Sequence, residues 1–226
     1  MEDRSKSRQP LTLERVLAAA VTLADAEGIK ALTMRRLAAE LGVEAMSLYF
    51  YLPGKDALLD GVVARVFAEV GEATGPDWRA TLRGQFLAAR EVMLRHPWAP
   101  GLLATRSTIP AGILAYYDRI LGTLLGAGFS HHLAHRAIHA FGSLPLGFAQ
   151  EVFSPAAGLD EGAAEADLAA MAGALPHLTA MVAHEMHDAT DPTLGWCDSQ
   201  VEFEFTVDLL LDGLERLRGS RSATRL

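Results

Sequence analysis

Residues 33–55 bring together cations, hydroxyl groups and small side chains in a short stretch that reads TMRRLAAELGVEAMSLYFYLPGK. Arginine can donate to the edge of a guanine in the major groove of DNA, and lysine or a phenol hydroxyl can donate to phosphate oxygens. Arg35 is the best candidate for a base contact, whereas Tyr49, Tyr51 and Lys55 suit phosphate. These residue types predict a DNA-binding surface.

The same stretch carries the signals for two short helices joined by a tight turn. Thr33 is suited to cap a first helix, whose apolar residues recur on one face, and Gly42 is suited to end it. Residues 44–51 then form a second helix, with Leu48 facing inward and small or hydroxylated residues outside. This pattern predicts a helix-turn-helix whose second helix fits a major groove. A plain α-hairpin within an all-helical domain has the same spacing and is the alternative.

The composition favours a soluble protein with a sizeable core. Half of the 226 residues are hydrophobic and the mean hydropathy is +0.16. The sequence contains no apolar run long enough to cross a membrane and no signal-peptide core at its polar N-terminus. The single cysteine, Cys197, excludes an internal disulfide framework and a cysteine-based zinc finger. We therefore expect a cytoplasmic protein with no membrane partner.

Taken alone, the net charge of −8 argues against binding to nucleic acid, but the charge is unevenly distributed. Residues 1–56 contain eight Lys and Arg and eight Asp and Glu, which leaves 12 basic and 20 acidic residues in the remainder. The excess of acid therefore lies outside the N-terminal quarter, and the global charge says little about a small binding face. The basic residues Arg4, Lys6 and Arg8 form either a solvated tail or a phosphate or minor-groove contact.

Apolar residues recur with the period of a helix along nearly the whole chain, and strand-like alternation is absent. The fold class that this predicts is all-α. Besides the two short helices, we expect helices at 11–27, 55–70, 77–95, 98–106, 110–127, 130–153, about 175–188 and 198–218. Pro145 should kink the helix at 130–153, and residues 154–175 should form a mobile connection.

Residues 13–67 resemble the N-terminal domain of the TetR family of bacterial transcriptional regulators. The resemblance rests on ERVLAAAVTLADAEGIKALTMRRLAAELGV at 14–43 and SLYFYLPGKDALLDGV at 47–62. The C-terminal part resembles the tetracycline-repressor type through HPWAPGLLATR at 96–106, GSLPLGFAQE at 142–151 and FEFTVDLLLDGLERL at 203–217. The resemblance implies a three-helix DNA-binding domain at 1–60, a helical ligand-binding and dimerisation domain at 61–218, and a tail at 219–226 that we expect to be disordered.

Together with the helix-capping residue Thr33, the resemblance implies a set of DNA contacts. These residues are Thr33, Arg35, Ala45, Met46, Ser47, Tyr49, Tyr51 and Lys55. Tetracycline repressors carry a longer polar residue where this chain has Ala45, so base recognition here rests on fewer hydrogen bonds. Ala45 or Met46 against thymine methyl groups would compensate in part.

The resemblance also implies that helices 130–153 and 198–218 pair with those of a second copy in a four-helix bundle. The residues expected at this dimer interface are Ile138, Phe141, Val152, Val201, Phe205 and Leu209. The alternative is that both apolar stripes face the core of the monomer.

A pocket for a lipophilic small-molecule effector is expected among the helices between 77 and 153. Its candidate residues are Phe86, Arg90, Met93, Leu102, Thr105, Arg106, Tyr117, His139, Phe141, Ser143 and Phe148. An apolar cavity with a few polar groups suits such a ligand, although each of these residues could equally be packing in the core.

We expect no cofactor and no tetracycline–magnesium complex. The two histidines that bind the ligand in tetracycline repressors correspond here to Leu102 and approximately Gly71. His131, His135 and His139 share one helix face at i, i+4 and i+8, and two such histidines can chelate zinc. No acidic residue follows the same spacing, so we assign no metal site, and whether these histidines bind a metal stays open.

These observations predict a homodimeric repressor that binds a palindromic operator and is released by a small molecule. The alternative is an all-α small-molecule-binding protein or enzyme that uses the C-terminal cavity, but no nucleophile–base pair or carboxylate pair supports catalysis. An architectural DNA-binding protein is a third possibility, against which the large apolar second domain argues.

Overall fold

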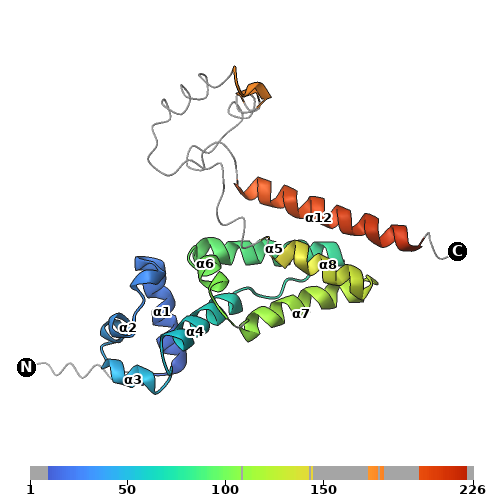
Figure 1. Cartoon of the computed structure of the whole chain (residues 1–226). Helices are drawn as coiled ribbons and strands as arrows, with labels where there is room; N and C mark the ends of the chain where they lie inside the picture. The colour runs from blue at the N-terminus through green and yellow to red at the C-terminus, as the bar shows by residue number, and fades with distance from the viewer. Residues whose placement is uncertain are drawn as a thin grey trace, which may run out of the picture. The chain divides into compact units, whose positions relative to one another are not determined.

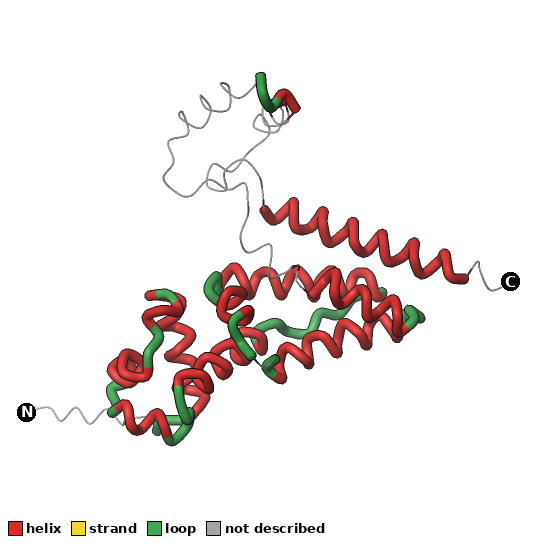
Figure 2. The backbone as a smooth tube through the Cα atoms, in the orientation of Figure 1, coloured by secondary structure: helices red, strands yellow, loops and turns green. Residues whose placement is uncertain are grey.

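The structure, a computed structural model, describes residues 10–107, 109–142, 144, 173–177, 179–180 and 199–222. The chain divides into two compact units, residues 1–149 and residues 150–226. Every regular element in the described ranges is helical, as Figures 1 and 2 show, so the all-α prediction is confirmed for them. None of the described helices combines the length and hydrophobicity that a bilayer-spanning segment needs.

The first three helices form the helix-turn-helix domain. Helix α1 covers Leu13–Glu27, a 3-10 turn covers Ile29–Ala31, α2 covers Met34–Leu41 and α3 covers Ala45–Tyr49. The caps are those that the sequence predicts: Thr33 Oγ1 accepts from Arg36 N at 3.1 Å, and Gly42 ends α2 with a φ of 65°. Leu32, Leu37 and Leu48 are fully buried and fill the space between these helices.

Helix α4, Lys55–Ala68, joins this domain to the rest of the first unit (Figure 1). It packs against α1 and against α7, with Leu58, Val62 and Val66 fully buried. The approach to α1 is close at Gly61, where a Cβ atom would lie 2.7 Å from Leu17 Cδ2. The domain boundary predicted after residue 60 falls inside this continuous helix, so α4 belongs to both sides of it.

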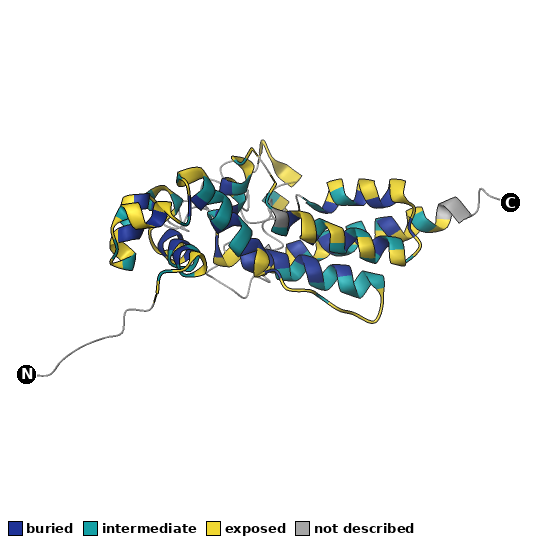
Figure 3. Ribbon diagram, turned by 90° about the horizontal axis from the view of Figure 1, so that it is seen from below, coloured by how far each residue is buried: buried dark blue, intermediate teal, exposed yellow. Residues whose placement is uncertain are grey.

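Helices α5, α6, α7 and α8 form the remainder of the first unit. They cover Trp78–Arg95, Ala99–Ala104, Ala111–Gly126 and His131–Gly142. Phe86 of α5 and Phe141 of α8 stack with their ring centroids 4.5 Å apart, and both are buried. Figure 3 shows how burial changes along the helices: buried positions face neighbouring helices and exposed positions face out.

The second unit is described mainly at α12, Ser199–Ser222. Its helix extends past the predicted end at 218, so the expectation of a disordered tail from residue 219 is wrong for residues 219–222. Gly219 alone does not stop a helix whose last turns are supported by an ion pair between Arg218 and Glu215. Residues 145–172, including the predicted kink at Pro145, lie outside the described residues.

Candidate DNA interface, interhelical contacts and effector cleft

The outer face of α3 is strongly exposed. Met46 is 75% exposed, Tyr49 is 44% exposed and Phe50, which directly follows the helix, is 86% exposed. Ser47 is also exposed, and Ala45 is half-buried. Leu48 is fully buried on the opposite side and fixes the helix to the domain. The predicted contact residues of α3 therefore lie where a DNA groove could reach them.

Phe50 is a residue that our sequence reasoning missed. It lies four residues after Met46, so the two side chains fall on one side of a helical turn, and both are exposed. The sequence could have identified it, because Phe50 is an aromatic residue at the end of the second helix and does not lie on that helix's inward face. Together Met46 and Phe50 give α3 an apolar outer surface.

One exposed cation precedes α3 in the chain and another follows it. Arg35 on α2 and Lys55 at the first position of α4 are both exposed, and neither forms an ion pair within the described ranges. Arg36 behaves differently, because it pairs with Glu27 of α1 at 2.5 Å and with Glu40 at 2.9 Å. The hydrogen bond with Glu27, followed by that with Glu40, raises the pKa of Arg36. Arg36 is thus a structural contact between α1 and α2, while Arg35 and Lys55 are available for a polyanion.

Tyr51 is not oriented as the sequence predicted. Its hydroxyl donates to the carbonyl oxygen of Leu11 at 2.6 Å, and the side chain is half-buried. A phenol has one hydrogen to donate, so a phosphate contact would require this bond to break. The role of phosphate donor assigned to Tyr51 is therefore corrected: Tyr51 joins α3 to the residue before the α1 cap.

A polar network connects α1, α4 and the residues between α5 and α6. His96 is 6% exposed, and its ring nitrogens lie 2.8 Å from Asp25 Oδ1 and 3.2 Å from Glu69 Oε2. Trp98 Nε1 donates to the same Asp25 oxygen at 2.7 Å, and Arg95 Nη1 donates to Glu69 at 2.9 Å. This network could not be predicted from the sequence, because its partners lie 26 to 73 positions apart in the chain.

Arg106, predicted in the effector pocket, lies at the other end of α4. Its Nε donates to Asp60 Oδ1 at 2.7 Å and its Nη2 donates to Asp56 Oδ1 at 3.1 Å. The guanidinium is therefore held by two carboxylates of α4, and its placement as a polar group of the pocket is corrected. Residues 95–106 thus contact both ends of α4 through charged side chains.

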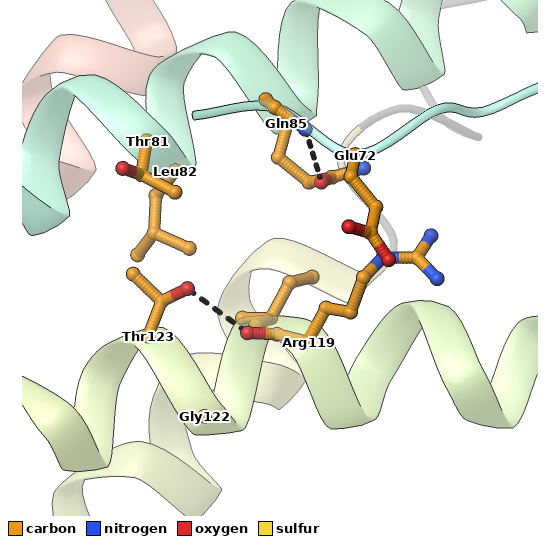
Figure 4. A pocket seen from close by; sticks show the side chains of 9 residues that line it. Glu72, Thr81, Leu82, Gln85, Arg119, Gly122 and Thr123 are labelled. Carbon is orange, nitrogen blue, oxygen red and sulfur yellow. Dashed lines mark hydrogen bonds between the residues drawn. The ribbon is translucent and has the colours of Figure 1, made fainter. Parts of the chain in front are cut away.

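An open cleft of about 390 Å³ lies between α5, α7 and the loop that precedes α5. Its lining residues are Glu72, Ala73, Thr81, Leu82, Gln85, Arg119, Ile120, Gly122 and Thr123. Figure 4 shows Arg119 and Thr123 of α7 across from Leu82 and Gln85 of α5. The volume lies within the range of small-molecule sites.

The polar groups of the cleft differ in how many of their hydrogen-bonding atoms are already engaged within the protein. Gln85 is engaged with the loop, because Nε2 donates to Gly71 O at 3.1 Å and Oε1 accepts from Ala73 N at 3.3 Å. Thr123 Oγ1 donates to the carbonyl oxygen of Arg119 at 3.0 Å. Arg119 Nη2 donates to Val70 O at 3.3 Å, while its buried Nε has no hydrogen-bond acceptor within the described residues. Arg119 is the only cationic side chain among the described residues that line the cleft.

The residues predicted for the pocket do not line this cleft. Phe86, Arg90, Met93, Leu102 and Phe141 are buried between helices. Thr105 is exposed and its hydroxyl donates to Leu102 O at 2.7 Å, and His139 is exposed on α8. Ser143 and Phe148 lie outside the described residues. The amphipathic pattern identified the packed core of the unit and missed the neighbouring surface on which the cleft opens.

On α7, Tyr116 is buried and Tyr117 is half-buried. Burial raises the pKa of both hydroxyl groups, so both stay protonated at neutral pH. Tyr117 donates to the carbonyl oxygen of Gly142 at 3.4 Å, which joins α7 to the end of α8. Tyr117, predicted to bind the effector, is thus engaged in a helix–helix contact.

The residues predicted for the dimer interface separate into exposed and buried positions. Val201, Phe205 and Leu209 of α12 are 59%, 59% and 50% exposed. Ile138 of α8 is half-buried, and Val152 lies outside the described residues. Phe141 is 1% exposed and stacks on Phe86, so its assignment to an outward-facing surface is corrected.

No group of three or more histidine, cysteine or acidic side chains is arranged to hold a metal ion within the part of the chain that the structure describes. His135 and His139 do lie against each other, with their Nε2 atoms 3.1 Å apart. His131 is exposed on the same helix and is not part of this contact.

Comparison with protein families gives two matches. Residues 16–62 match the family described as bacterial regulatory proteins, tetR family. Residues 71–218 match the family described as Tetracyclin repressor-like, C-terminal domain. Together the two families cover nearly all of the chain from the first helix onward.

Similar proteins include regulators from Streptomyces and Saccharopolyspora. The HTH-type transcriptional repressor DrrR1 of Streptomyces coeruleorubidus is 32% identical over 96% of this chain and 83% of the repressor. An HTH-type transcriptional regulator of Saccharopolyspora erythraea is 37% identical, and the match spans 57% of this chain and only 55% of that relative. The structure of ActR from Streptomyces coelicolor in complex with actinorhodin has a TM-score of 0.72 and 26% identity, and covers 93% of this chain and 99% of ActR.

Proposed function

Because the chain belongs to the TetR family of bacterial regulatory proteins, and is thereby a ligand-responsive, DNA-binding transcriptional regulator, we propose that it acts as a homodimeric repressor. The dimer binds a palindromic operator through two copies of α3 and is released by a lipophilic small molecule. The family consists of transcriptional regulators rather than enzymes.

The observation that carries the proposed DNA site is the exposed outer face of α3, with one exposed cation before α3 in the chain and another after it. Arg35 reads a base edge, and Lys55 binds a phosphate together with the exposed N–H groups at the start of α4. Thr33, Ser47 and Tyr49 add hydroxyl groups that contact the DNA backbone. Ala45 and Met46 face the bases. Base recognition then depends on one arginine and on apolar contacts, so the spacing of the two half-sites contributes much of the specificity.

The apolar stripe of α12 supports the homodimer. Val201, Phe205 and Leu209 expose half or more of their surface along one side of the helix, while Phe203, Val207 and Leu211 on the other side are fully buried. A monomer rarely leaves such a row of large apolar residues in water. A second copy of this chain would cover the stripe in a two-fold arrangement.

The cleft between α5 and α7 is the proposed effector site. Its apolar residues suit a lipophilic molecule, and Arg119 suits a carbonyl, phenolate or carboxylate oxygen on that molecule. The similar protein ActR was solved in complex with actinorhodin, which supports a small-molecule effector for this chain. The cleft replaces the sequence-predicted pocket as the first region to test.

Release from DNA requires a path from this cleft to α3. Helix α4 is the proposed lever, because the loop after α4 lines the cleft at Glu72 and its first residue, Lys55, belongs to the DNA interface. An effector that favours a different angle of α4 would change the distance between the two α3 helices of the dimer. A coupling free energy of about 1–3 kcal/mol suffices for such regulation.

The proposal is tested with the purified full-length chain and the DNA upstream of its own gene. We expect saturable binding to one palindromic segment at moderate salt and dissociation when a suitable compound is added, followed by fluorescence anisotropy. Binding that is equally strong to scrambled DNA of the same length would contradict an operator-specific repressor. Actinorhodin, the ligand in the similar ActR structure, is the first compound to test.

A further inference from the structure

The exposed face of α8 carries histidines that neither the DNA interface nor the effector cleft uses. His131, His132, His135 and His139 are all exposed. None of them lines the cleft between α5 and α7. Two of the four are brought together by the helix.

His135 and His139 are one helical turn apart and point at each other. Their Nε2 atoms are separated by 3.1 Å, and their ring centroids are 4.7 Å apart at an interplanar angle of 54°. Imidazole nitrogens bind metal ions through a lone pair, and here the two distal nitrogens lie side by side.

This separation, which is also that of a hydrogen bond between the two rings, is close to the one that a shared metal ion requires. Two nitrogens about 2.0–2.1 Å from a tetrahedral zinc ion lie about 3.3–3.4 Å apart, and at a right angle they lie about 2.9 Å apart. The 3.1 Å between the two Nε2 atoms falls between these values. A small rotation of either ring about its side-chain bonds reaches the tetrahedral spacing.

We propose that His135 and His139 form a two-ligand site on α8 for a divalent transition-metal ion of the zinc, nickel or copper type. Imidazole suits these ions, and water completes their coordination because both side chains face solvent. Two protein ligands make the site weaker than a structural zinc site, which has four.

The surroundings of the pair define how the site behaves. Arg136 is exposed beside His135 and lies three residues before His139, so its positive charge weakens binding of a cation. An ion held by both rings cross-links a turn of α8 close to the contact between Tyr117 and Gly142.

The test uses the full-length protein without a histidine tag, treated with EDTA and desalted. Zn²⁺ is titrated at neutral pH in competition with a chromophoric chelator, and Ni²⁺ is titrated in parallel. We expect one ion per chain and at least about a tenfold loss of affinity in His135→Ala and in His139→Ala. Zn²⁺ should raise the Tm of the natural protein and leave that of His139→Gln unchanged.

His131→Ala and His132→Ala are the matched controls, since both remove an exposed histidine from the same helix. They should bind Zn²⁺ as the natural protein does. Equal binding by the natural protein and by the double variant His135→Ala/His139→Ala would overturn the site, and so would an equal loss in His131→Ala. These outcomes are independent of operator binding, so the proposed function and this metal site succeed or fail separately.

Discussion

His96 Nδ1 lies 2.8 Å from Asp25 Oδ1, a contact between residues 71 positions apart in the chain. Asp25 belongs to the last turns of α1 in the DNA-binding domain, and His96 follows α5 directly. Trp98 donates to the same carboxylate oxygen, so one acidic side chain anchors two aromatic groups. The orientation of α1 is therefore tied to the start of α6 as well as to α4.

Asp25→Ala should destabilise the protein and weaken the tie between the DNA-binding domain and the rest of its unit. The substitution leaves the nearly buried His96 ring nitrogen and the Trp98 N–H without their acceptor. A buried donor without an acceptor costs about 1–3 kcal/mol, and we expect a loss of that size in urea unfolding. Operator affinity should fall as well, because α1 supports α2 and α3.

Glu91→Ala is the control for this variant. Glu91 is an exposed acidic residue of α5, so its removal changes the net charge equally without touching the network. If both variants unfold at the same urea concentration as the natural protein, the Asp25 contacts contribute nothing measurable.

Lys55→Ala should weaken operator binding about equally for all DNA sequences and reduce the dependence on salt. Loss of one phosphate contact lowers the magnitude of the slope of log K against log salt by about one. Arg35→Ala should instead cost about 1–3 kcal/mol and relax specificity at one base pair, because a bidentate base contact is lost. Anisotropy titrations at several salt concentrations distinguish the two effects.

Arg136→Ala removes an exposed arginine of α8 and is the matched control for both variants. Circular dichroism should show the helical content of all three proteins unchanged. A salt slope in Lys55→Ala that equals that of Arg136→Ala would remove Lys55 from the DNA interface.

Replacing thymine by uracil in the operator should reveal how Met46 and Phe50 are used. Both side chains are largely exposed on the outer face of α3, and an apolar contact with a thymine methyl group is worth about 0.8 kcal/mol, or about fourfold in affinity. At the contacted positions we expect uracil to weaken the natural protein and to have little effect on Met46→Ala or Phe50→Ala. If the natural protein binds uracil-substituted and thymine operators equally, methyl groups are not read.

The local features of the helix-turn-helix could be predicted from the sequence. The Thr33 cap and the left-handed Gly42 depend on the residue and its immediate neighbours, so residue type and spacing identify them. The same holds for most helix ends, including α5, whose predicted range of 77–95 compares with Trp78–Arg95. Short-range chemistry decides these positions.

The contacts of His96, Arg106 and Tyr51 could not be predicted in the same way. Each joins residues that are at least 27 positions apart, and the sequence does not say which carboxylate or carbonyl group will lie within reach. The cleft escaped prediction for a related reason. Helical periodicity identifies side chains that fill space, such as Phe86, but it does not reveal where space between Gln85 and Arg119 is left unfilled.

Phe205→Glu should convert the proposed dimer into monomers. The side chain of Phe205 is 59% exposed, so a charge is tolerated in the monomer, whereas burial of two carboxylates near a two-fold axis is strongly unfavourable. Sedimentation velocity should show half the natural mass, and operator affinity should fall because two half-sites are no longer bound together.

Arg216→Glu, a charge change at another exposed position of α12, should sediment as the natural protein does. A dimer in Phe205→Glu would move the interface away from this stripe.

Arg119→Met should weaken the response to effector and leave operator binding intact. Methionine keeps much of the length of the side chain in the cleft but removes the buried Nε–H and the donor to Val70. A charge-assisted hydrogen bond contributes about 1.5–3 kcal/mol, so the effector concentration needed for half-release should rise at least about tenfold. Arg136→Met on α8 carries the same chemical change outside the cleft and should respond normally. If Arg119→Met were released at the natural effector concentration while an effector-free titration showed unchanged operator affinity, the effector would bind somewhere other than between α5 and α7.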